Sequence, residues 1–292
     1  MKIYVVIHNK NSRVRNLKEE YIDSLFSSYN LKYIYKATYS YEDLDQTIKL
    51  YKDSSIYQYC TIGGDGSLNS LINALMFNNI SMPEVSVLPA GSGSDFIRTF
   101  AIPQNIEDAV SHLSTNNYYE VDVGYVKNKT DEKYFVNVLN IGFLADSVET
   151  SEKLPNLFKR FRYPLSFWLK IINAKASQTY VVTDRGEFNN KAFNISVCNA
   201  QYFGGGWNIS PKSSLQDGLL NTQIFAVSKL KAMKIFFLAK RGLHLKESDV
   251  LLKNTSNIAL MTNQAIEIDG DYFGHGPAAI FITHRAILFQ IS

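Results

Sequence analysis

Apolar residues recur along the first part of the chain with two alternating spacings. Continuous apolar runs typical of buried strands occupy residues 2–8, 33–38, 55–62 and 84–88. Between them, apolar residues three or four positions apart predict amphipathic helices at residues 15–29, 41–51 and 67–77. Because strands that alternate with helices form parallel sheets, this part of the chain predicts a doubly wound α/β domain.

The pattern changes near residue 121, where strand-like runs begin to follow one another with few long helices between them. These runs lie at residues 121–126, 134–141, 179–183, 193–199, 219–226 and 257–268. Such a series predicts an antiparallel β-rich domain. We expect a first domain at residues 1–125, completed by a last strand at 280–292, and a second domain at 126–279.

Composition narrows the class of protein. Hydrophobic residues make up 46% of the 292 residues and charged residues 20%, which is typical of a globular chain. Cys60 and Cys198 each lie in an apolar run, so we expect buried thiols and neither a disulfide framework nor a zinc site. The apolar run at residues 3–7 is too short for a signal peptide, and no stretch is long enough to span a bilayer, so we expect a cytoplasmic protein.

Positive charge is concentrated in two segments, residues 153–175 and 229–246. Each contains six lysines and arginines and no acidic residue, although the formal net charge of the whole chain is only +3. Both segments also carry aromatic and aliphatic residues, a combination that favours adsorption to an anionic membrane surface. The alternative, two helices that pack on the β-rich domain with solvated basic faces, is equally compatible. No nucleic-acid-binding module accompanies them, so we expect no nucleic acid partner.

A glycine-rich turn follows the third predicted strand. Gly63, Gly64 and Gly66 surround Asp65, and Ser67 is expected to cap the next helix. Glycines let phosphate oxygens approach the main-chain amides, and a helix N-terminus adds unpaired N–H groups. The turn therefore predicts a phosphate site, with a ligand-free strand-to-helix turn as the alternative. No lysine follows the glycines, so a metal or another group must neutralise the phosphate charge.

A second turn of small residues follows the fourth predicted strand at residues 88–95. It also precedes a helix-like stretch. The carboxyl ends of parallel strands meet at one edge of the sheet, where ligands of open α/β sheets bind. Two such turns at one edge favour a ligand site over a plain turn.

The two turns resemble motifs of a known family. The first resembles the signature of the diacylglycerol kinase catalytic domain at Gly63, Gly64, Asp65, Gly66, Ser67, Leu68 and Asn69. That domain is shared with sphingosine and ceramide kinases and, more distantly, with NAD kinases. The second turn resembles the family's second motif over residues 89–95. With the later motifs given below, the order matches the bacterial soluble diacylglycerol kinase branch over essentially the whole chain.

The resemblance implies a doubly wound nucleotide-binding domain followed by a β-sandwich-like domain, with an ATP site in the cleft between them. Residues 63–69 would cradle the phosphates. The nucleotide would also be contacted by Ser92 in the second turn, by Thr38 after the second strand and by Asn9 after the first.

Magnesium is implied by a segment of the second domain. The Asp217-Gly218 pair on its own is a turn signal, and a simple β-turn is the alternative. In the family this segment holds Mg²⁺ through the aspartate and main-chain carbonyls, which here would be those of Ser214 and Leu219. Oxygen ligands of this kind suit a hard cation.

Two aspartates are candidates for the catalytic base. Asp271 stands where the family's Asp-Gly-Glu turn has its glutamate, one methylene shorter, and Asp65 is favoured by analogy with sphingosine kinases. Asp122 matches a family aspartate that helps to hold the metal network, and a solvent-facing strand aspartate is the alternative for it.

Taken together, these motifs predict an ATP-dependent kinase that phosphorylates the hydroxyl of diacylglycerol to give phosphatidic acid. Two alternatives stay open: a kinase of another lipid, such as phosphatidylglycerol or a sphingoid base, and a non-catalytic nucleotide-binding sensor of the same fold. We expect ATP and Mg²⁺ as cofactors and peripheral binding to the inner face of the membrane through residues 153–175 and 229–246. A homodimer is plausible for the family.

Overall fold

The computed structural model describes residues 2–12, 14–90, 94–155 and 162–291, and it divides into two compact units. Unit 1 comprises Met1–Val123 and His284–Ser292, and unit 2 comprises Gly124–Thr283. The sequence placed the corresponding boundaries at residues 125 and 280.

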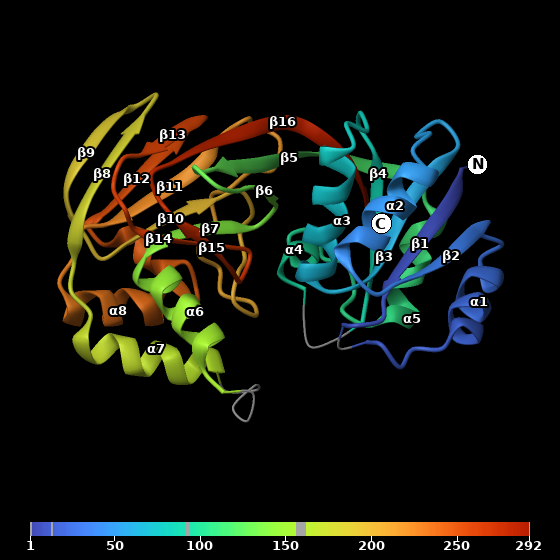
Figure 1. Ribbon diagram of the computed structural model, residues 1–292, viewed down its shortest axis with the longest axis horizontal. Helices are drawn as coiled ribbons and strands as arrows, with labels where there is room; N and C mark the ends of the chain where they lie inside the picture. The colour runs from blue at the N-terminus through green and yellow to red at the C-terminus, as the bar shows by residue number, and fades with distance from the viewer. Residues whose placement is uncertain (1, 13, 91–93, 156–161, 292) are drawn as a thin grey trace. The chain divides into compact units, whose positions relative to one another are not determined.

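Unit 1 is built on a sheet of parallel strands (Figure 1). Their order is β2 (Tyr33–Thr38), β1 (Ile3–Asn9), β3 (Tyr57–Gly63), β4 (Glu84–Pro89) and the end of β16 (Ala278–Ile291). The strands β1, β3 and β4 are buried along nearly their whole length. Burial on both faces explains why these strands appear in the sequence as continuous apolar runs.

Helices cover both faces of this sheet. The helices α1 (Glu19–Ser28) and α5 (Ile106–Ala109) share one core cluster with Tyr4 and Val6 of β1. The helices α2 (Tyr41–Leu50) and α3 (Asp65–Phe77) contact each other and pack on the opposite face (Figure 1). The short helix α4 (Asp95–Arg98) and a 3₁₀ turn (Val110–Ser114) lie on the way to β5 (Asn117–Lys127). The predicted doubly wound α/β fold is confirmed.

Unit 2 is a sandwich of two sheets joined by one apolar core. The first sheet contains β6 (Glu132–Phe135), the end of β5, the start of β16, β13 (Asn257–Leu260), β8 (Ser177–Thr183) and β9 (Gly186–Ala192). The second has the antiparallel order β12 (Val250–Thr255), β11 (Leu220–Phe225), β10 (Asn194–Cys198), β7 (Val138–Gly142), β14 (Ala265–Ile268) and β15 (Asp271–His275). Apolar residues of both sheets, among them Phe135, Leu139 and Ile258, form the core between them.

The outer face of the second sheet is covered by three helices, α6 (Phe143–Lys153), α7 (Arg162–Asn173) and α8 (Lys229–Ala239) (Figure 1). A short 3₁₀ turn (Leu243–Lys246) follows α8. No helix in the described part of the chain is long and apolar enough to cross a bilayer.

Several predicted elements differ from the structure. The run at 134–141 is two strands, β6 and β7, because the N–H groups of Val136 and Asn137 donate to the Asp269 carboxylate and leave the ladder. The run at 257–268 is also two strands, β13 and β14, which belong to different sheets. The helix after the glycine turn begins at Asp65 with Gly64 as its N-cap, so Ser67 is not the cap.

Three strands and the helices α5 and α6 were missed by the sequence pattern. The strands β9, β12 and β15 each lie at the edge of a sheet. Edge strands are partly exposed and therefore show little apolar alternation; β9 is exposed at most of its positions. The helix α6 follows β7 directly, without a polar linker that would separate the two patterns.

Strand β16 changes partners within one strand. Its first residues pair with β13 in unit 2, and Leu288 and Phe289 pair with β4 in unit 1. Between these stretches Arg285 adopts a left-handed conformation, with φ of 48°. The fully buried Asp122 carboxylate accepts hydrogen bonds from the Arg285 main-chain N–H at 2.7 Å and from His284 Nδ1 at 2.8 Å. The alternative of a solvent-facing Asp122 is therefore wrong.

We expect Asp122→Ala to lower the free energy of unfolding by about 2–3 kcal/mol, because it removes the buried carboxylate that accepts hydrogen bonds from the Arg285 N–H and from His284. Glu120→Ala on the same strand is the matched control. Glu120 makes a 3.0 Å ion pair with Arg285, but both side chains are substantially exposed, so its loss should cost at most about 1 kcal/mol. Urea denaturation measures both; equal effects of the two substitutions would contradict the anchoring role of Asp122.

Candidate active site

The predicted nucleotide-contacting residues of unit 1 lie at one edge of its sheet. Asn9 and Thr38 are paired at the carboxyl ends of β1 and β2, and Gly63 is paired with Pro89 at the ends of β3 and β4. The Ala90 N–H donates to the Gly63 carbonyl at 3.2 Å, which ties the second turn to the first. The structure therefore brings Asn9, Thr38 and Gly63 to one edge of the sheet. Ser92, the fourth predicted contact, lies outside the described residues.

The conformation of the glycine turn explains its first glycine. Gly63 has φ of +154°, and a Cβ there would lie only 2.2 Å from Ser67 Oγ, so a side chain at position 63 is excluded by Ser67. Gly66 is exposed, and nothing lies within 4 Å of the place where its Cβ would be. The first N–H groups of a helix have no partner inside it, so the open first turn of α3 can present amides to an anion.

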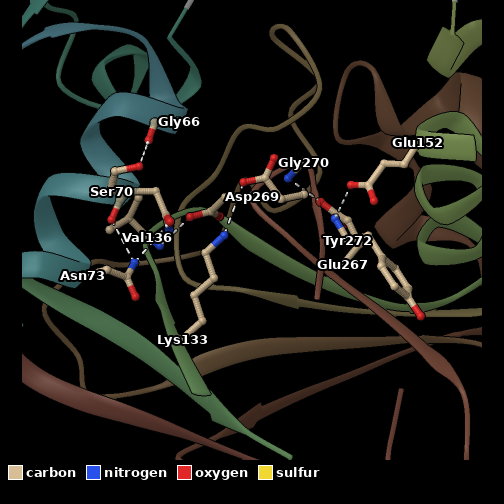
Figure 2. Close-up of polar contacts among 12 residues, drawn as sticks. Gly66, Ser70, Asn73, Lys133, Val136, Glu152, Glu267, Asp269, Gly270 and Tyr272 are labelled. Atoms are coloured by element: carbon tan, nitrogen blue, oxygen red, sulfur yellow. Dashed lines mark hydrogen bonds and ion pairs between the residues drawn. The ribbon is translucent and has the colours of Figure 1, made fainter. Parts of the chain in front are cut away.

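The remaining two residues of the motif face inward. Leu68 is fully buried, and the side chain of Asn69 accepts a hydrogen bond from Asn73 Nδ2 one turn later in α3. In Figure 2 the Ser70 hydroxyl donates to the Gly66 carbonyl within the same helix. Of residues 63–69, the part open to a ligand is thus the main chain around Gly64 to Gly66.

Asp65 fastens the second turn to the first. One oxygen accepts from Ser94 Oγ at 3.1 Å and from the Phe96 N–H at 3.0 Å, and the other accepts from the Asp95 N–H at 2.7 Å. A carboxylate at the start of α4 is favourable because it satisfies N–H groups that have no helical partner. These three bonds give Asp65 a positioning role in the fold of the two turns.

In unit 2, a buried carboxylate holds the turn between β14 and β15. Asp269 accepts hydrogen bonds from the N–H groups of Val136 at 2.9 Å, Asn137 at 3.0 Å and Val138 at 2.9 Å. Figure 2 shows the bond from Val136. Burial raises the pKa of Asp269 to about 6, while the three N–H donors act in the opposite direction by stabilising its charged form. Asp269 has φ of 50°, a conformation that this clamp maintains.

Glu267 is the second buried carboxylate beside this turn. It accepts from Asn140 Nδ2 at 2.7 Å. It also accepts from the Gly270 N–H at 2.5 Å (Figure 2). Burial raises the pKa of the Glu267 carboxyl to about 7, and the charges of Asp269 and Asp271 act in the same direction. Sequence reasoning missed both Glu267 and Asp269 as members of the site. A glutamate between two isoleucines of a strand is the signal that could have found the first.

Asp271, in contrast, points to solvent. Its side chain is 67% exposed, and it forms a 3.2 Å ion pair with Lys133 of β6. The next residue, Tyr272, donates its main-chain N–H to Glu152 of α6 at 3.2 Å. The turn thus presents an accessible carboxylate on a main chain that is fixed from both sides.

The predicted magnesium loop contributes one carboxylate. Asp217 is exposed and accepts from the Leu219 N–H at 3.1 Å, and Gly218 supports the turn with φ of +69°. Ser214 and Leu219 would add main-chain carbonyl oxygens. This all-oxygen donor set fits a hard cation that keeps several waters. No group of three or more His, Cys, Asp or Glu side chains that could hold a metal occurs in the described ranges.

The raised pKa of Glu267 predicts a dependence of stability on pH. Its pKa in the folded protein, about 7, lies above the ordinary 4.5, so the unfolded chain loses this proton first as the pH rises. Wild type should lose stability relative to Glu267→Gln between pH 5 and pH 8, by about 1–3 kcal/mol. Urea denaturation across this range measures the difference. The difference in stability between wild type and Glu132→Gln, which changes an exposed carboxylate, should stay constant over this range. A constant difference between wild type and Glu267→Gln would contradict the burial effect.

Comparisons with known proteins identify both parts of the chain. Residues 3–126 match the diacylglycerol kinase catalytic domain, and residues 137–289 match the YegS C-terminal NAD kinase beta sandwich-like domain. The chain is 27% identical over 290 residues to a diacylglycerol kinase of Staphylococcus aureus (strain bovine RF122 / ET3-1), covering 97% of this chain and 90% of that protein. It is 29% identical over 229 residues to the one from strain Newman, covering 77% and 71%.

Solved structures show the same fold. The crystal structure of a putative diacylglycerol kinase from Bacillus anthracis str. Sterne superimposes with a TM-score of 0.79 at 20% identity, covering all of this chain and 95% of that one. The predicted fold class, a doubly wound domain followed by a β-sandwich-like domain, is confirmed. The chain therefore belongs to the family that joins a diacylglycerol kinase catalytic domain to a YegS C-terminal NAD kinase beta sandwich-like domain.

Proposed function

We propose that this protein is an ATP-dependent kinase that transfers the γ-phosphoryl group to the free hydroxyl of diacylglycerol, giving phosphatidic acid. The observation that carries this proposal is Asp271, an exposed carboxylate on a turn held by the buried carboxylates Asp269 and Glu267. Phosphoryl transfer requires positioning and charge neutralisation more than covalent chemistry. A rigid main chain with one accessible carboxylate meets the first requirement.

Each residue of the site has a distinct task in this proposal. The amides at the start of α3 bind phosphate oxygens, and Gly63 and Gly66 keep the approach free of side chains. Asp271 accepts the proton of the lipid hydroxyl as the oxygen attacks the γ-phosphorus, and the phosphorus–oxygen bond to ADP breaks. Asp217, Ser214 and Leu219 would hold Mg²⁺, which supplies positive charge near the phosphates. Lys133 forms a 3.2 Å ion pair with Asp271 and so places a positive charge beside this carboxylate.

The contacts of the two candidate bases favour Asp271 over Asp65. Asp65 already accepts three bonds from residues 94–96, and its removal would disturb the turn that they form. Asp271 has one ion-pair partner and is open to solvent. A proton acceptor must lie within hydrogen-bond reach of the substrate hydroxyl, which favours the accessible group.

The lipid surface is the second part of the proposal. The helices α7 and α8 lie side by side, since the rings of Phe167 and Phe236 are 4.6 Å apart and Lys229 Nζ donates to the Ile172 carbonyl. Large apolar side chains on these two helices and just after them are exposed: Trp168, Leu169, Ile172, Leu230, Phe237 and Leu243. Part of the basic segment 153–175, residues 156–161, lies outside the described residues.

The basic residues on α8 and just after it differ in whether they form ion pairs within the protein. Lys231 and Lys234 are ion-paired with Asp249 and Glu247. Lys240 and Arg241 are exposed at the end of the helix, beside Phe237. Exposed apolar and basic side chains together are the pattern by which proteins adsorb to anionic bilayers. We propose that this face of α7 and α8 contacts the membrane that holds the substrate.

We expect Asp271→Ala to reduce phosphate transfer to diacylglycerol by at least about 100-fold while ATP binding is retained, because proton transfer to a positioned base contributes about 10²–10⁴-fold. Asp271→Glu should keep substantial activity, and Glu132→Ala, which removes another exposed carboxylate of unit 2, should have little effect. Turnover with labelled ATP and binding of ATP by calorimetry are measured separately. Near-normal turnover of Asp271→Ala would move the role of base to Asp65.

We expect the protein to sediment with vesicles that contain phosphatidylglycerol more than with vesicles of phosphatidylcholine alone. The double substitution of Lys240 and Arg241 by glutamine should weaken this binding, by about fivefold for each residue if each contributes about 1 kcal/mol. The exposed aromatic Tyr39 of unit 1 provides a control, since Tyr39→Ala should bind as wild type does. Equal binding to both kinds of vesicle would contradict the proposed surface.

A further inference from the structure

A row of buried polar side chains in unit 2 ends beside the turn that carries Asp271. Asn194 Nδ2 donates to Ser196 Oγ at 3.1 Å, and Ser196 Oγ donates to Asn140 Oδ1 at 2.6 Å. Asn140 Nδ2 in turn donates to Glu267 Oε2 at 2.7 Å. All four side chains are almost completely buried, and the last three residues are directly paired on the neighbouring strands β10, β7 and β14. The row is therefore a fixed part of the second sheet.

The hydrogen bonds of this row all run in one direction, toward Glu267. The Asn140 amide is held in its orientation, because its oxygen accepts from Ser196 and, at 3.3 Å, from Asn194. The other Glu267 oxygen accepts from the Gly270 N–H at 2.5 Å (Figure 2). Both oxygens of the carboxylate thus face donors, and aligned hydrogen bonds strengthen one another. This arrangement suits an ionised Glu267, whereas a proton on either oxygen would oppose a donor.

The surroundings of Glu267 act against this charge. Burial, together with the charges of Asp269 and Asp271, raises the pKa of the Glu267 carboxyl to about 7, so both of its forms are populated near neutral pH. Strand β7 has no titratable side chain. The other charged or titratable side chains on the elements around β14 are those of Lys133 beside the turn, Tyr272 and His275 of β15, and Asp146, Glu149, Glu152 and Lys153 of α6, which packs on β14.

We propose that Glu267 is a positioning residue for phosphoryl transfer: its carboxylate holds the Gly270 N–H and so places Asp271, and a proton taken up by Glu267 from water releases the turn. The inference rests on the proposed function, because it assigns a proton-dependent control to the same site. Glu267 does not touch the substrate in this role. It acts through the main chain of Gly270, the residue that precedes Asp271.

This role gives activity and stability opposite responses to pH. As the pH rises through about 7, Glu267 loses its proton, and the buried charge lowers the stability of wild type relative to Glu267→Gln. The same loss of the proton restores the contact with Gly270, so the activity of wild type relative to Glu267→Gln should rise. For a residue that only supports the fold, activity would follow stability and both responses would have the same sign.

The test is the pH profile of kcat and KM for phosphate transfer to a short-chain, water-soluble diacylglycerol, which avoids any effect of pH on membrane binding. Wild type should lose kcat as the pH falls, with a midpoint of about 7. In Glu267→Gln the midpoint should move to about 6, where Asp269 titrates. At high pH its kcat should be about tenfold lower with KM for ATP unchanged, because a small misplacement of Asp271 slows the chemical step.

Two control variants keep the assignment specific to Glu267. Glu132→Gln changes an exposed carboxylate, and His275→Gln changes a titratable side chain of β15; both should keep the wild-type midpoint. A thermal melt verifies that each variant is folded. A midpoint that moves with His275→Gln and not with Glu267→Gln would overturn the role of Glu267.

A second substitution should restore the row. Glu267→Gln combined with Asn140→Asp places the carboxylate on β7, so the new amide at position 267 can donate to it and still accept from the Gly270 N–H. Position 140 continues to accept from Ser196 and Asn194. We expect the double variant to recover most of the kcat that Glu267→Gln loses at high pH. A double variant less active than Glu267→Gln would contradict the directional row.

A measurement that needs no activity separates this inference from the proposed function. In protein labelled with ¹⁵N-glycine, the Gly270 amide resonance should shift with a midpoint of about 7 in wild type, and Glu267→Gln should lose this transition. A titrating Gly270 amide without phosphate transfer to any lipid would support the control of the turn by Glu267 and count against the kinase. Phosphate transfer with a pH profile that Glu267→Gln leaves unchanged, or a Gly270 amide that does not titrate, would overturn the inference and leave the kinase intact.

Discussion

The turn that carries Asp271 depends on one buried carboxylate. Asp269 accepts hydrogen bonds from the N–H groups of residues 136–138, at the point where β6 ends and β7 begins. These bonds also fix the main chain between β14 and β15. Three hydrogen bonds to a charged group offset much of the cost of burying it. Without this clamp neither Gly270 nor Asp271 would have a defined place, and Glu267 would lose the main-chain donor that it shares with the turn.

In unit 1 a carboxylate also fixes the main chain, but there it joins two turns. Asp65 accepts from one hydroxyl and two main-chain N–H groups of residues 94–96, so the glycine turn and the second turn become one structure. In both units a carboxylate in the middle of a recognisable motif holds the main chain, while the neighbouring groups remain open to a ligand. An acidic residue within a sequence motif can therefore have a structural role, as Asp65 and Asp269 do.

The sequence was sufficient for the architecture of unit 1 and for the class of unit 2. Strands β1, β3 and β4 are buried on both faces, so their apolar runs are unmistakable, and the intervening helices have clear apolar sides. The edge strands β9, β12 and β15 could not be predicted, because partial exposure removes the alternation on which such a prediction depends. The splits at Val136 and after Leu260 depend on contacts with distant residues, which a local pattern does not contain.

The candidate site was predicted unevenly for a similar reason. Motifs located the glycine turn, Asp217 and Asp271, since each is marked by residues close together in the sequence. The partners that position the turn of Asp271, Glu267 and Asn140, lie on neighbouring strands and contact each other across the sheet, so their spacing in the sequence does not reveal them. The open main chain around Gly64 to Gly66 and the accessible carboxylate of Asp271 are the two features on which the proposed chemistry depends.

Incubation of the purified protein with γ-labelled ATP, Mg²⁺ and a panel of lipids tests the central claim most directly. The panel should include diacylglycerol, phosphatidylglycerol and a sphingoid base. The account predicts that label passes to diacylglycerol and appears in phosphatidic acid. Tight binding of ATP without transfer of label to any lipid would contradict it and indicate a nucleotide sensor of the same fold.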